Sequence, residues 1–285
     1  MNSNNKIGIV TPLRNEVESI PKLFDSIMSQ TIPIYYWLIV ENDSTDGSIN
    51  MLNEFKKKCK NVNKLEIINL KSLNSEYALG TKYATVVNTG FNHIKDTIIN
   101  ELDFIGILDA DCFPEPKYFE VLTNEMRSRP KLGISSGMLY HDDGTRDFAS
   151  KSWVQGGNRL WSIECFLDAG YYVAPSADTI SACKAILKGW LVEPIHNIKV
   201  ISRKMGEKVN YKYYGYSWYY RGHTLFFGLL VTMKLLFKGE FRRSTQFANG
   251  FFGSYYKQVP RIDDEEIINF YRHHLSRKLY NAIKK

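Results

Sequence analysis

The chain has 285 residues, of which 44% are hydrophobic and 24% are charged, and it carries a formal net charge of +7. This composition is ordinary for globular proteins and excludes a disordered, collagenous or fibrous chain. The four cysteines show neither CxxC spacing nor the density of a disulfide-stapled secreted domain, which favours reduced thiols in a cytoplasmic protein. No cationic segment followed by an apolar run opens the sequence, so we expect no secretory signal.

Short β-rich runs alternate with helical patterns over the first two hundred residues. This alternation predicts an α/β fold in which helices cover both faces of a mostly parallel central sheet. Because the loops at the ends of parallel strands project side chains into one crevice, we expect ligands to bind there. We predict strands over residues 6–11, 36–40, 64–70, 104–108 and 198–201, and helices over residues 17–30, 46–59, 77–94 and 178–189.

The loop after the first predicted strand reads TPLRNE over residues 11–16. We expect the backbone at Thr11 and Pro12 to approach a nucleotide, with Arg14 near a phosphate. Glu16 is a candidate partner for a ribose hydroxyl. The loop has no GxGxxG and the chain has no GxxxxGK[ST], which disfavours dinucleotide-binding and P-loop folds.

The second predicted strand runs into a polar stretch, VENDSTDGS, over residues 40–48. Ser44 or Thr45 at this place can cap the following helix, which is the structural explanation for the stretch. The functional alternative makes Asn42 and its neighbours hydrogen-bonding groups for a nucleobase or ribose. Lys82, in the third predicted helix, is a candidate to face a diphosphate, although a solvated helix face explains it equally well.

The fourth predicted strand, FIGIL, stops at Asp109-Ala110-Asp111. Two carboxylates one residue apart at a strand end can share a hard divalent cation, and Mg²⁺ prefers one or two carboxylates plus substrate phosphates. This arrangement is expected of an enzyme whose leaving group is a nucleoside diphosphate, because the metal neutralises charge on the departing oxygen. The alternative is a solvated acidic turn.

Together these three loops resemble those of the family 2 glycosyltransferases, which have a GT-A fold. Members of that family typically have a first strand ending in TPxxNE, a second ending in a stretch like VDDGSTDGT, and a metal site like LDADxxPxP. Residues 11–16, 40–48 and 108–116 are similar to these motifs, and the resemblance covers roughly residues 6–203. Asn42 stands where the family has the acid that contacts the base, which leaves the nucleobase open.

The resemblance extends to residues expected near the acceptor. The stretch GGNRLW over residues 156–161 looks like the family's glycine-rich acceptor-side segment, which implies acceptor or sugar contacts by Gly157, Arg159 and Trp161. Glycines permit close backbone approach, and Trp161 offers an apolar face; the alternative is a turn before a buried helix. Asp178 stands where the family has its catalytic base, although alanine replaces the preceding acid of the usual pair. A plain helix N-cap is the alternative for Asp178.

The resemblance implies a GT-A catalytic domain, which we place over residues 1–205, and charge and aromatic content set apart a helical, basic and aromatic extension over residues 206–285. The implied reaction moves a hexose from a nucleoside-diphosphate sugar to a hydroxyl of a saccharide or lipid-linked acceptor, by an inverting single displacement. Asp111 would hold Mg²⁺ or Mn²⁺, with Asp109 assisting it or contacting the ribose, and Asp178 would take the acceptor proton. Two other interpretations stay open: a nucleotidyltransferase, and a non-catalytic sugar-nucleotide-binding protein docked on a membrane.

The positive charge is concentrated in the extension. Residues 1–205 carry 23 Lys and Arg against 24 Asp and Glu, whereas residues 206–285 carry 14 against 6, together with 19 of the 39 aromatic residues. Basic residues beside aromatic ones suit an anionic membrane face, and the uncharged runs of the extension are too short to span a bilayer. We therefore expect a cytoplasmic protein that is peripheral on the inner face of the cell membrane, with a second small core or an oligomer interface as the alternative. We expect no nucleic-acid partner, because no RNP, KH or helix-turn-helix pattern accompanies the charge.

Overall fold

The computed structural model describes residues 5–71, 81–147, 151, 153–203, 210–274 and 276. The chain divides into two compact units, Met1–Lys204 and Met205–Lys285. This division falls one residue from the boundary expected between the catalytic domain and the extension. The two units are described in turn.

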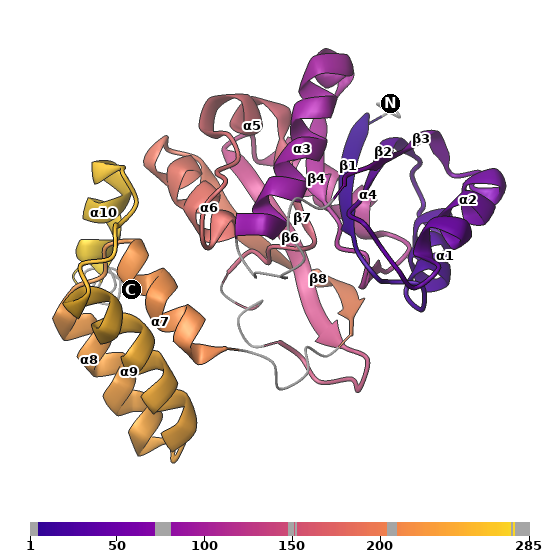
Figure 1. The fold of residues 1–285 in the computed structure, drawn as a ribbon. Coiled ribbons are helices and arrows are strands. Elements are labelled where there is room, and N and C mark those ends of the chain that lie inside the picture. Colours follow the sequence, from indigo (N-terminus) through magenta and orange to yellow (C-terminus); the bar gives the residue numbers. More distant parts are fainter. Residues whose placement is uncertain are drawn as a thin grey trace. The chain divides into compact units, whose positions relative to one another are not determined.

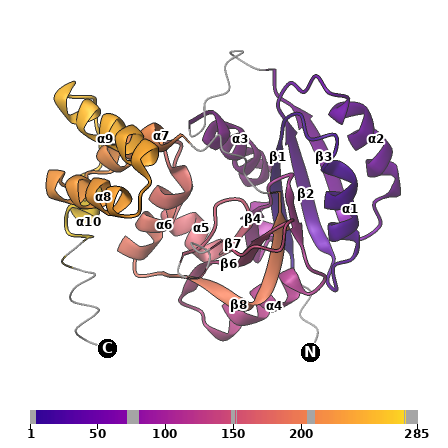
Figure 2. The same ribbon diagram turned by 90° about the horizontal axis from the view of Figure 1, so that it is seen from below.

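The first unit is built on one sheet of eight strands, counted over the described residues (Figures 1 and 2). Across the sheet the strands follow the order β3-β2-β1-β4-β7-β6-β8-β5. Parallel pairs join β1 to β2 and β4, β2 to β3, and β6 to β8. Antiparallel pairs join β7 to β4 and β6, and β5 to β8, so the sheet is mostly parallel, as predicted. The strands are β1 (Ile7–Leu13), β2 (Ile34–Glu41), β3 (Val62–Asn69), β4 (Phe104–Ile107), β5 (Cys112–Pro114), β6 (Leu132–His141), β7 (Arg159–Ser162) and β8 (Leu191–Ser202).

Helices cover both faces of this sheet (Figure 2). Because side chains alternate along a strand, Trp37 of β2 packs into one core while its neighbour Leu38 packs into the other. The first core is completed by α1, α2 and α4, and the second by α3, α5 and α6. The helices are α1 (Ile20–Met28), α2 (Ser48–Lys58), α3 (Thr81–Thr97), α4 (Tyr118–Ser128), α5 (Ile163–Ala169) and α6 (Ala177–Leu187), with a short 3-10 turn, η1 (Ile99–Glu101).

The sequence predictions were good at the two ends of this unit and poor in its middle. The predicted strands and helices between residues 6 and 108 are present with shifted ends, although residues 77–80 of the third helix lie outside the described part of the chain. The last strand is much longer than predicted, since β8 begins at Leu191. Between residues 109 and 177 no element was predicted, yet this stretch holds β5, α4, β6, β7 and α5.

The order of the strands brings the predicted loops to one edge. Since β1 lies between β2 and β4 and is parallel to both, the carboxyl ends of all three strands meet at the same side of the sheet. The loops that begin after Leu13, Glu41 and Ile107 are therefore neighbours. This is the edge at which open α/β sheets bind ligands.

The second unit is a group of helices with a small aromatic core formed by Tyr219, Phe247 and Phe251. α7 and α9 cross so closely that a Cβ on Gly250 would lie 2.0 Å from the Lys212 carbonyl oxygen. Among the described residues, none of the helices is long and apolar enough to cross a bilayer. The helices are α7 (Tyr211–Tyr220), α8 (Leu225–Phe237), α9 (Phe241–Tyr256) and α10 (Glu265–Arg272).

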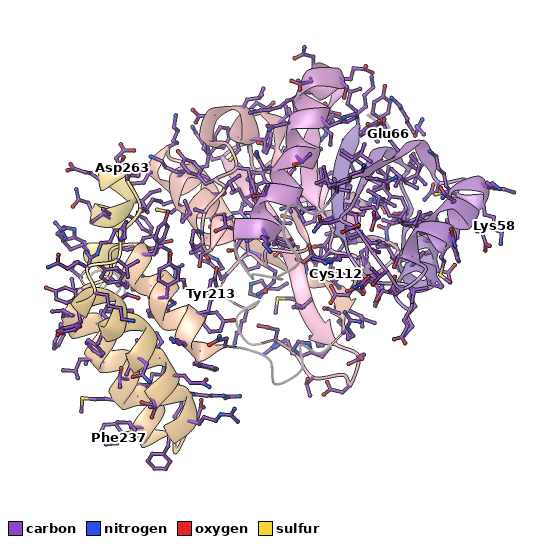
Figure 3. All side chains as sticks on the ribbon, in the orientation of Figure 1. Lys58, Glu66, Cys112, Tyr213, Phe237 and Asp263 are labelled. Atoms are coloured by element: carbon purple, nitrogen blue, oxygen red, sulfur yellow. The ribbon has the colours of Figure 1, made fainter. Side chains whose placement is uncertain are left out.

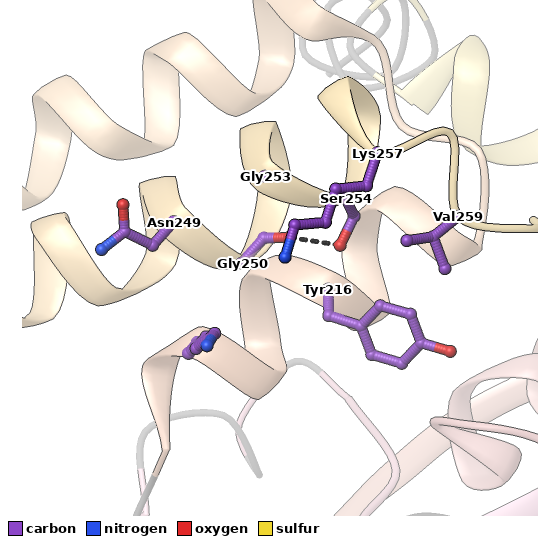
Figure 4. A pocket seen from close by; sticks show the side chains of 8 residues that line it. Tyr216, Asn249, Gly250, Gly253, Ser254, Lys257 and Val259 are labelled. Atoms are coloured by element: carbon purple, nitrogen blue, oxygen red, sulfur yellow. Dashed lines mark hydrogen bonds between the residues drawn. The ribbon is translucent and has the colours of Figure 1, made fainter.

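A groove of about 460 Å³ runs along the contact between α7 and α9 (Figure 4). The Ser254 hydroxyl in its lining already donates a hydrogen bond to the Gly250 carbonyl at 2.6 Å. None of the site residues predicted from the sequence lines this groove. Its lining includes Lys212, Tyr216, Asn249, Gly250, Ser254 and Lys257.

Candidate active site

The acidic pair that follows β4 is held in place from two sides. The Tyr83 hydroxyl of α3 donates to Asp109 Oδ1 at 2.5 Å, and the Asp109 amide donates to the Gly157 carbonyl at 2.7 Å. Asp109 and Asp111, with the neighbouring Cys112 (labelled in Figure 3), offer ligand atoms that all lie within 4.8 Å of one another. The predicted pair of carboxylates thus converges on one point.

Burial and neighbouring acidic groups raise the pKa of both carboxylates. Burial, and then the charge of Asp111, raise the pKa of Asp109 from its usual 3.8 to about 7. The pKa of Asp111 is raised by burial and by the charge of Glu16. A cation at this point would relieve the repulsion, and carboxylate oxygens are the ligands that Mg²⁺ and Mn²⁺ prefer. Burial keeps the pKa of the Cys112 thiol well above its usual range, so the sulfur stays protonated and is a poor ligand for a hard cation. The donor set therefore fits a divalent metal held by Asp109 and Asp111.

The raised pKa of Asp109 predicts how the stability of the metal-free protein depends on pH. Between pH 4 and 7 the folded state keeps the Asp109 proton, while the unfolded chain ionises near 3.8. The unfolding free energy must therefore fall as the pH rises through this window. We expect calorimetry in chelator to show a lower Tm at pH 8 than at pH 5, with a smaller drop in Asp109→Asn. Equal drops in the two proteins would contradict the assignment.

Arg203 joins the acidic cluster from the far end of the sheet. Its guanidinium donates to Glu16 Oε1 at 2.9 Å and lies 3.8 Å from Asp111 Oδ2. The register of β5 and β8 explains the contact, because Cys112 pairs with Ser202 and so places Arg203 beside Asp111. The sequence analysis missed Arg203 as a site residue; a basic residue two positions after a predicted strand was the available signal.

The first two loops are tied together by reciprocal hydrogen bonds. The Asn15 amide donates to the Ser44 hydroxyl at 2.9 Å, and the Thr45 amide donates to Asn15 Oδ1 at 2.8 Å. The Glu16 amide donates to the Ser48 hydroxyl at 3.0 Å. Neither Ser44 nor Thr45 caps α2, whose N-cap is Gly47. The serines therefore organise the junction between the loops.

The predicted nucleotide contacts are placed unequally by this junction. Thr11 is fully buried and accepts a hydrogen bond from Trp37 Nε1 at 2.9 Å, so its side chain supports the loop from inside. Pro12, Arg14 and Asn42 are half-buried along the same edge of the sheet. The amide of Asn42 donates to the Leu13 carbonyl at 2.9 Å, which joins the ends of β1 and β2.

α3 contributes two residues to the same region. Lys82 is half-buried in the first turn of the helix. It directly precedes Tyr83, whose hydroxyl contacts Asp109. The sequence analysis named Lys82 and missed Tyr83, because only the packing of α3 against the sheet brings the phenol to the acidic pair.

The Gly156–Gly157 pair lies between the carboxylates of Asp109 and Asp178. A Cβ on Gly157 would lie 1.9 Å from Asp109 Oδ2, and one on Gly156 would lie 3.2 Å from Asp178 Oδ2. The glycines thus approach the protein's own carboxylates, and the sugar contact expected of Gly157 stays a prediction. Asp178 lies in the first turn of α6, where its side chain is 39% exposed.

The contact at Gly157 predicts the effect of adding a methyl group. In Gly157→Ala the new Cβ must displace the Asp109 carboxylate or the loop, and overpacking of this kind costs about 1–3 kcal/mol. We expect a lower Tm and weaker Mn²⁺ binding, measured by calorimetry. Gly253→Ala is the matched control, because a Cβ there meets nothing within 4 Å. An unchanged metal affinity in Gly157→Ala would show that the contact does not set the position of Asp109.

Arg159 and Trp161 do not occupy the acceptor-contacting positions expected of them. The Arg159 side chain is completely buried, and its Nε and Nη1 donate to the carbonyls of Gln155 at 2.6 Å and Asp178 at 2.8 Å. Trp161 is fully buried, and its ring lies 5.8 Å from that of Phe91. The reason is that β7 is an interior strand whose two faces pack into the two cores, with Leu160 in the first and Trp161 in the second. Arg159 instead positions the segment that carries Asp178.

Comparison with known proteins assigns the chain to a family. The family model described as "Glycosyl transferase family 2" matches residues 8–193. A poly(ribitol-phosphate) beta-glucosyltransferase from Bacillus spizizenii is 42% identical over 59 residues, which are 20% of this chain and 9% of that protein. The chain thus matches less than a tenth of the length of this relative.

Two solved structures have a similar fold. TarS 1–349 from S. aureus in complex with UDP-GlcNAc is 14% identical, with a TM-score of 0.55 over 93% of this chain and 79% of that one. The mannosyltransferase PcManGT from Pyrobaculum calidifontis, in complex with GDP-Man and Mn²⁺, is 15% identical, with a TM-score of 0.54 over 76% and 64%. The predicted GT-A fold is confirmed by these likenesses.

Proposed function

Since the chain belongs to glycosyl transferase family 2, we propose that it transfers a sugar from a nucleoside-diphosphate donor to an acceptor hydroxyl. The observation that carries the proposal is that Asp109 and Asp178 lie against the two halves of the Gly156–Gly157 pair, with Asp111 beside Asp109. The UDP-GlcNAc and GDP-Man in the similar structures support a nucleoside-diphosphate sugar as the donor.

The leaving-group side of the reaction belongs to the acidic pair. Asp111, assisted by Asp109, would hold Mg²⁺ or Mn²⁺. When bound, this cation would neutralise the charge on the departing diphosphate. Tyr83 fixes the Asp109 carboxylate by its hydrogen bond. Arg14, Asn42 and Lys82 are our candidates for contacts with the nucleotide. Pro12 lies in β1, two residues before Arg14, and Glu16 is turned toward Arg203.

The nucleophile side belongs to Asp178. Its carboxylate is 39% exposed and lies 3.8 Å from Arg159 Nη2, and it would accept a proton from the acceptor hydroxyl as that oxygen attacks the anomeric carbon. Arg159 holds the Asp178 backbone in place through the hydrogen bond from its Nη1 to the Asp178 carbonyl. Attack from the face opposite the diphosphate inverts the anomeric configuration.

A thermal-shift panel tests the donor assignment. UDP-, GDP- and dTDP-sugars are added to the protein with Mn²⁺ present or chelated. A ligand that binds the folded state alone stabilises it by RT ln(1 + [L]/Kd), which is about 2.7 kcal/mol at a hundredfold excess over Kd. We expect one nucleotide class to raise the Tm only when Mn²⁺ is present. A shift without any transfer or hydrolysis of the sugar would favour a non-catalytic binding protein, and no shift with any nucleotide would contradict the proposal.

A further inference from the structure

One side of α8 exposes a continuous strip of large apolar side chains. The strip follows spacings of three and four residues, which place its members along one side of a helix. Single exposed apolar residues are ordinary, whereas a contiguous apolar strip of this kind marks an interaction surface. We define the α8 face by its exposed residues Leu225, Phe226, Leu229, Leu230, Met233, Leu236 and Phe237.

The opposite side of the same helix is already occupied. Phe227 is buried, and Val231 and Leu235 pack against the core formed by Tyr219, Phe247 and Phe251. A helix that is apolar all round is expected to be covered all round. The packing within the second unit satisfies one side of α8 and leaves the α8 face toward solvent.

Basic residues border the α8 face. Lys234 and Lys238 are exposed on α8 and directly after it, and Arg242 is exposed at the start of α9. The nearby acid, Glu240, is engaged by Arg243 at 3.0 Å. Residues 206–285 as a whole carry 14 basic against 6 acidic residues. The charge of this border is complementary to an anionic surface.

We propose that the α8 face docks on an anionic phospholipid bilayer, with α8 lying in the plane of the interface. Its 13 residues span about 20 Å, and the apolar side chains enter the boundary between headgroups and acyl chains while the lysines meet lipid phosphates. Phe237, 84% exposed at the end of α8 (labelled in Figure 3), is the deepest anchor. This inference stands on the second unit alone and is independent of the proposed glycosyl transfer.

Vesicle co-sedimentation tests the proposal. The full chain is mixed with vesicles of phosphatidylcholine alone or of phosphatidylcholine with phosphatidylglycerol. We expect binding to the anionic vesicles that weakens as salt rises from about 0.1 M to 1 M, because the Debye length shrinks from about 10 Å to 3 Å. Phe237→Glu should lower the partition by about tenfold or more, and Lys234→Gln and Lys238→Gln by about fivefold each.

Tyr256→Glu is the matched control. It places the same charge at an aromatic residue that is 89% exposed on α9, outside the α8 face, and should leave partitioning within about twofold of the wild type. Equal loss in Tyr256→Glu, or equal binding to neutral vesicles, would overturn the proposal. So would light scattering that shows a dimer which Phe237→Glu dissociates, because a second copy would then cover the face. The thermal shift with sugar nucleotides should be the same in all these variants, which separates a failure here from a failure of the proposed function.

Discussion

Asp178→Asn is expected to lower kcat by about 10²–10⁴-fold while leaving the affinity for the sugar nucleotide nearly unchanged. An amide cannot take the proton from the attacking hydroxyl, and loss of a positioned general base has an effect of this size. The substitution keeps the shape of the side chain and the hydrogen bond from Arg159 to the Asp178 backbone carbonyl, although it removes the carboxylate charge that lies 3.8 Å from Arg159 Nη2. The measurement is steady-state transfer, with the donor Kd from calorimetry.

Asp168→Asn is the matched control for this experiment. Asp168 is a surface carboxylate of α5 that contacts Lys188 at 3.0 Å and the Trp190 indole at 2.8 Å. Its loss should leave kcat within a factor of about two, since surface pairs contribute little. If Asp178→Asn kept turnover near the wild-type rate, another group would have to be the base.

Asp111→Asn is expected to weaken both the binding of the metal and the transfer of the sugar. The variant loses a charged ligand, so the Mn²⁺ affinity should fall and the metal-dependent thermal shift with the sugar nucleotide should disappear. Transfer should drop by about 10³-fold, because stabilisation of the leaving diphosphate by a metal contributes several kcal/mol. Direct Mn²⁺ titration by calorimetry separates lost metal binding from lost chemistry.

The contrast between the two variants is the sharper readout. Asp178→Asn should keep the metal-dependent shift and lose transfer, whereas Asp111→Asn should lose both. Asp111→Asn also removes one of the two acidic partners of Arg203, which retains Glu16 at 2.9 Å. Wild-type Mn²⁺ affinity in Asp111→Asn would contradict the proposed metal site.

Local patterns predicted the parts of the site that lie at strand ends. β1, β2 and β4 are short apolar runs that stop at polar residues, so the order of residues alone indicated where the loops begin. Asp109 and Asp111 follow β4 directly, and their convergence needs only the turn between them. For the same reason the half of the sheet formed by β3, β2, β1 and β4 was predictable.

Contacts between distant segments could not be predicted in this way. Arg203 reaches Asp111 because three-residue β5 pairs antiparallel with β8, and a strand that short has no periodicity to detect. Tyr83 reaches Asp109 because α3 packs over the sheet, which depends on tertiary structure.

The misplacement of Arg159 and Trp161 has a similar origin. Their segment reads as polar and glycine-rich at its start, and nothing local shows that β7 inserts between β4 and β6. An arginine whose side chain is fully buried is unusual. It is tolerated here because three backbone carbonyls accept its hydrogen bonds and the Asp178 carboxylate lies 3.8 Å from its Nη2.

The short main-chain stretch from Gly157 to Arg159 connects the parts of the site that carry Asp109 and Asp178. The Gly157 carbonyl accepts a hydrogen bond from the Asp109 amide, and Arg159 donates one to the Asp178 carbonyl. The proposed metal ligand and the proposed base are therefore tied to one short span of main chain. The Arg159 side chain that makes this link is completely buried and bonded to two further carbonyls, so the spacing between Asp109 and Asp178 depends on this span and on the fixed position of Arg159. Engineering of the donor or acceptor specificity should therefore keep the length of this span and vary the loops around it. An insertion in the span would shift Asp109 and Asp178 relative to each other.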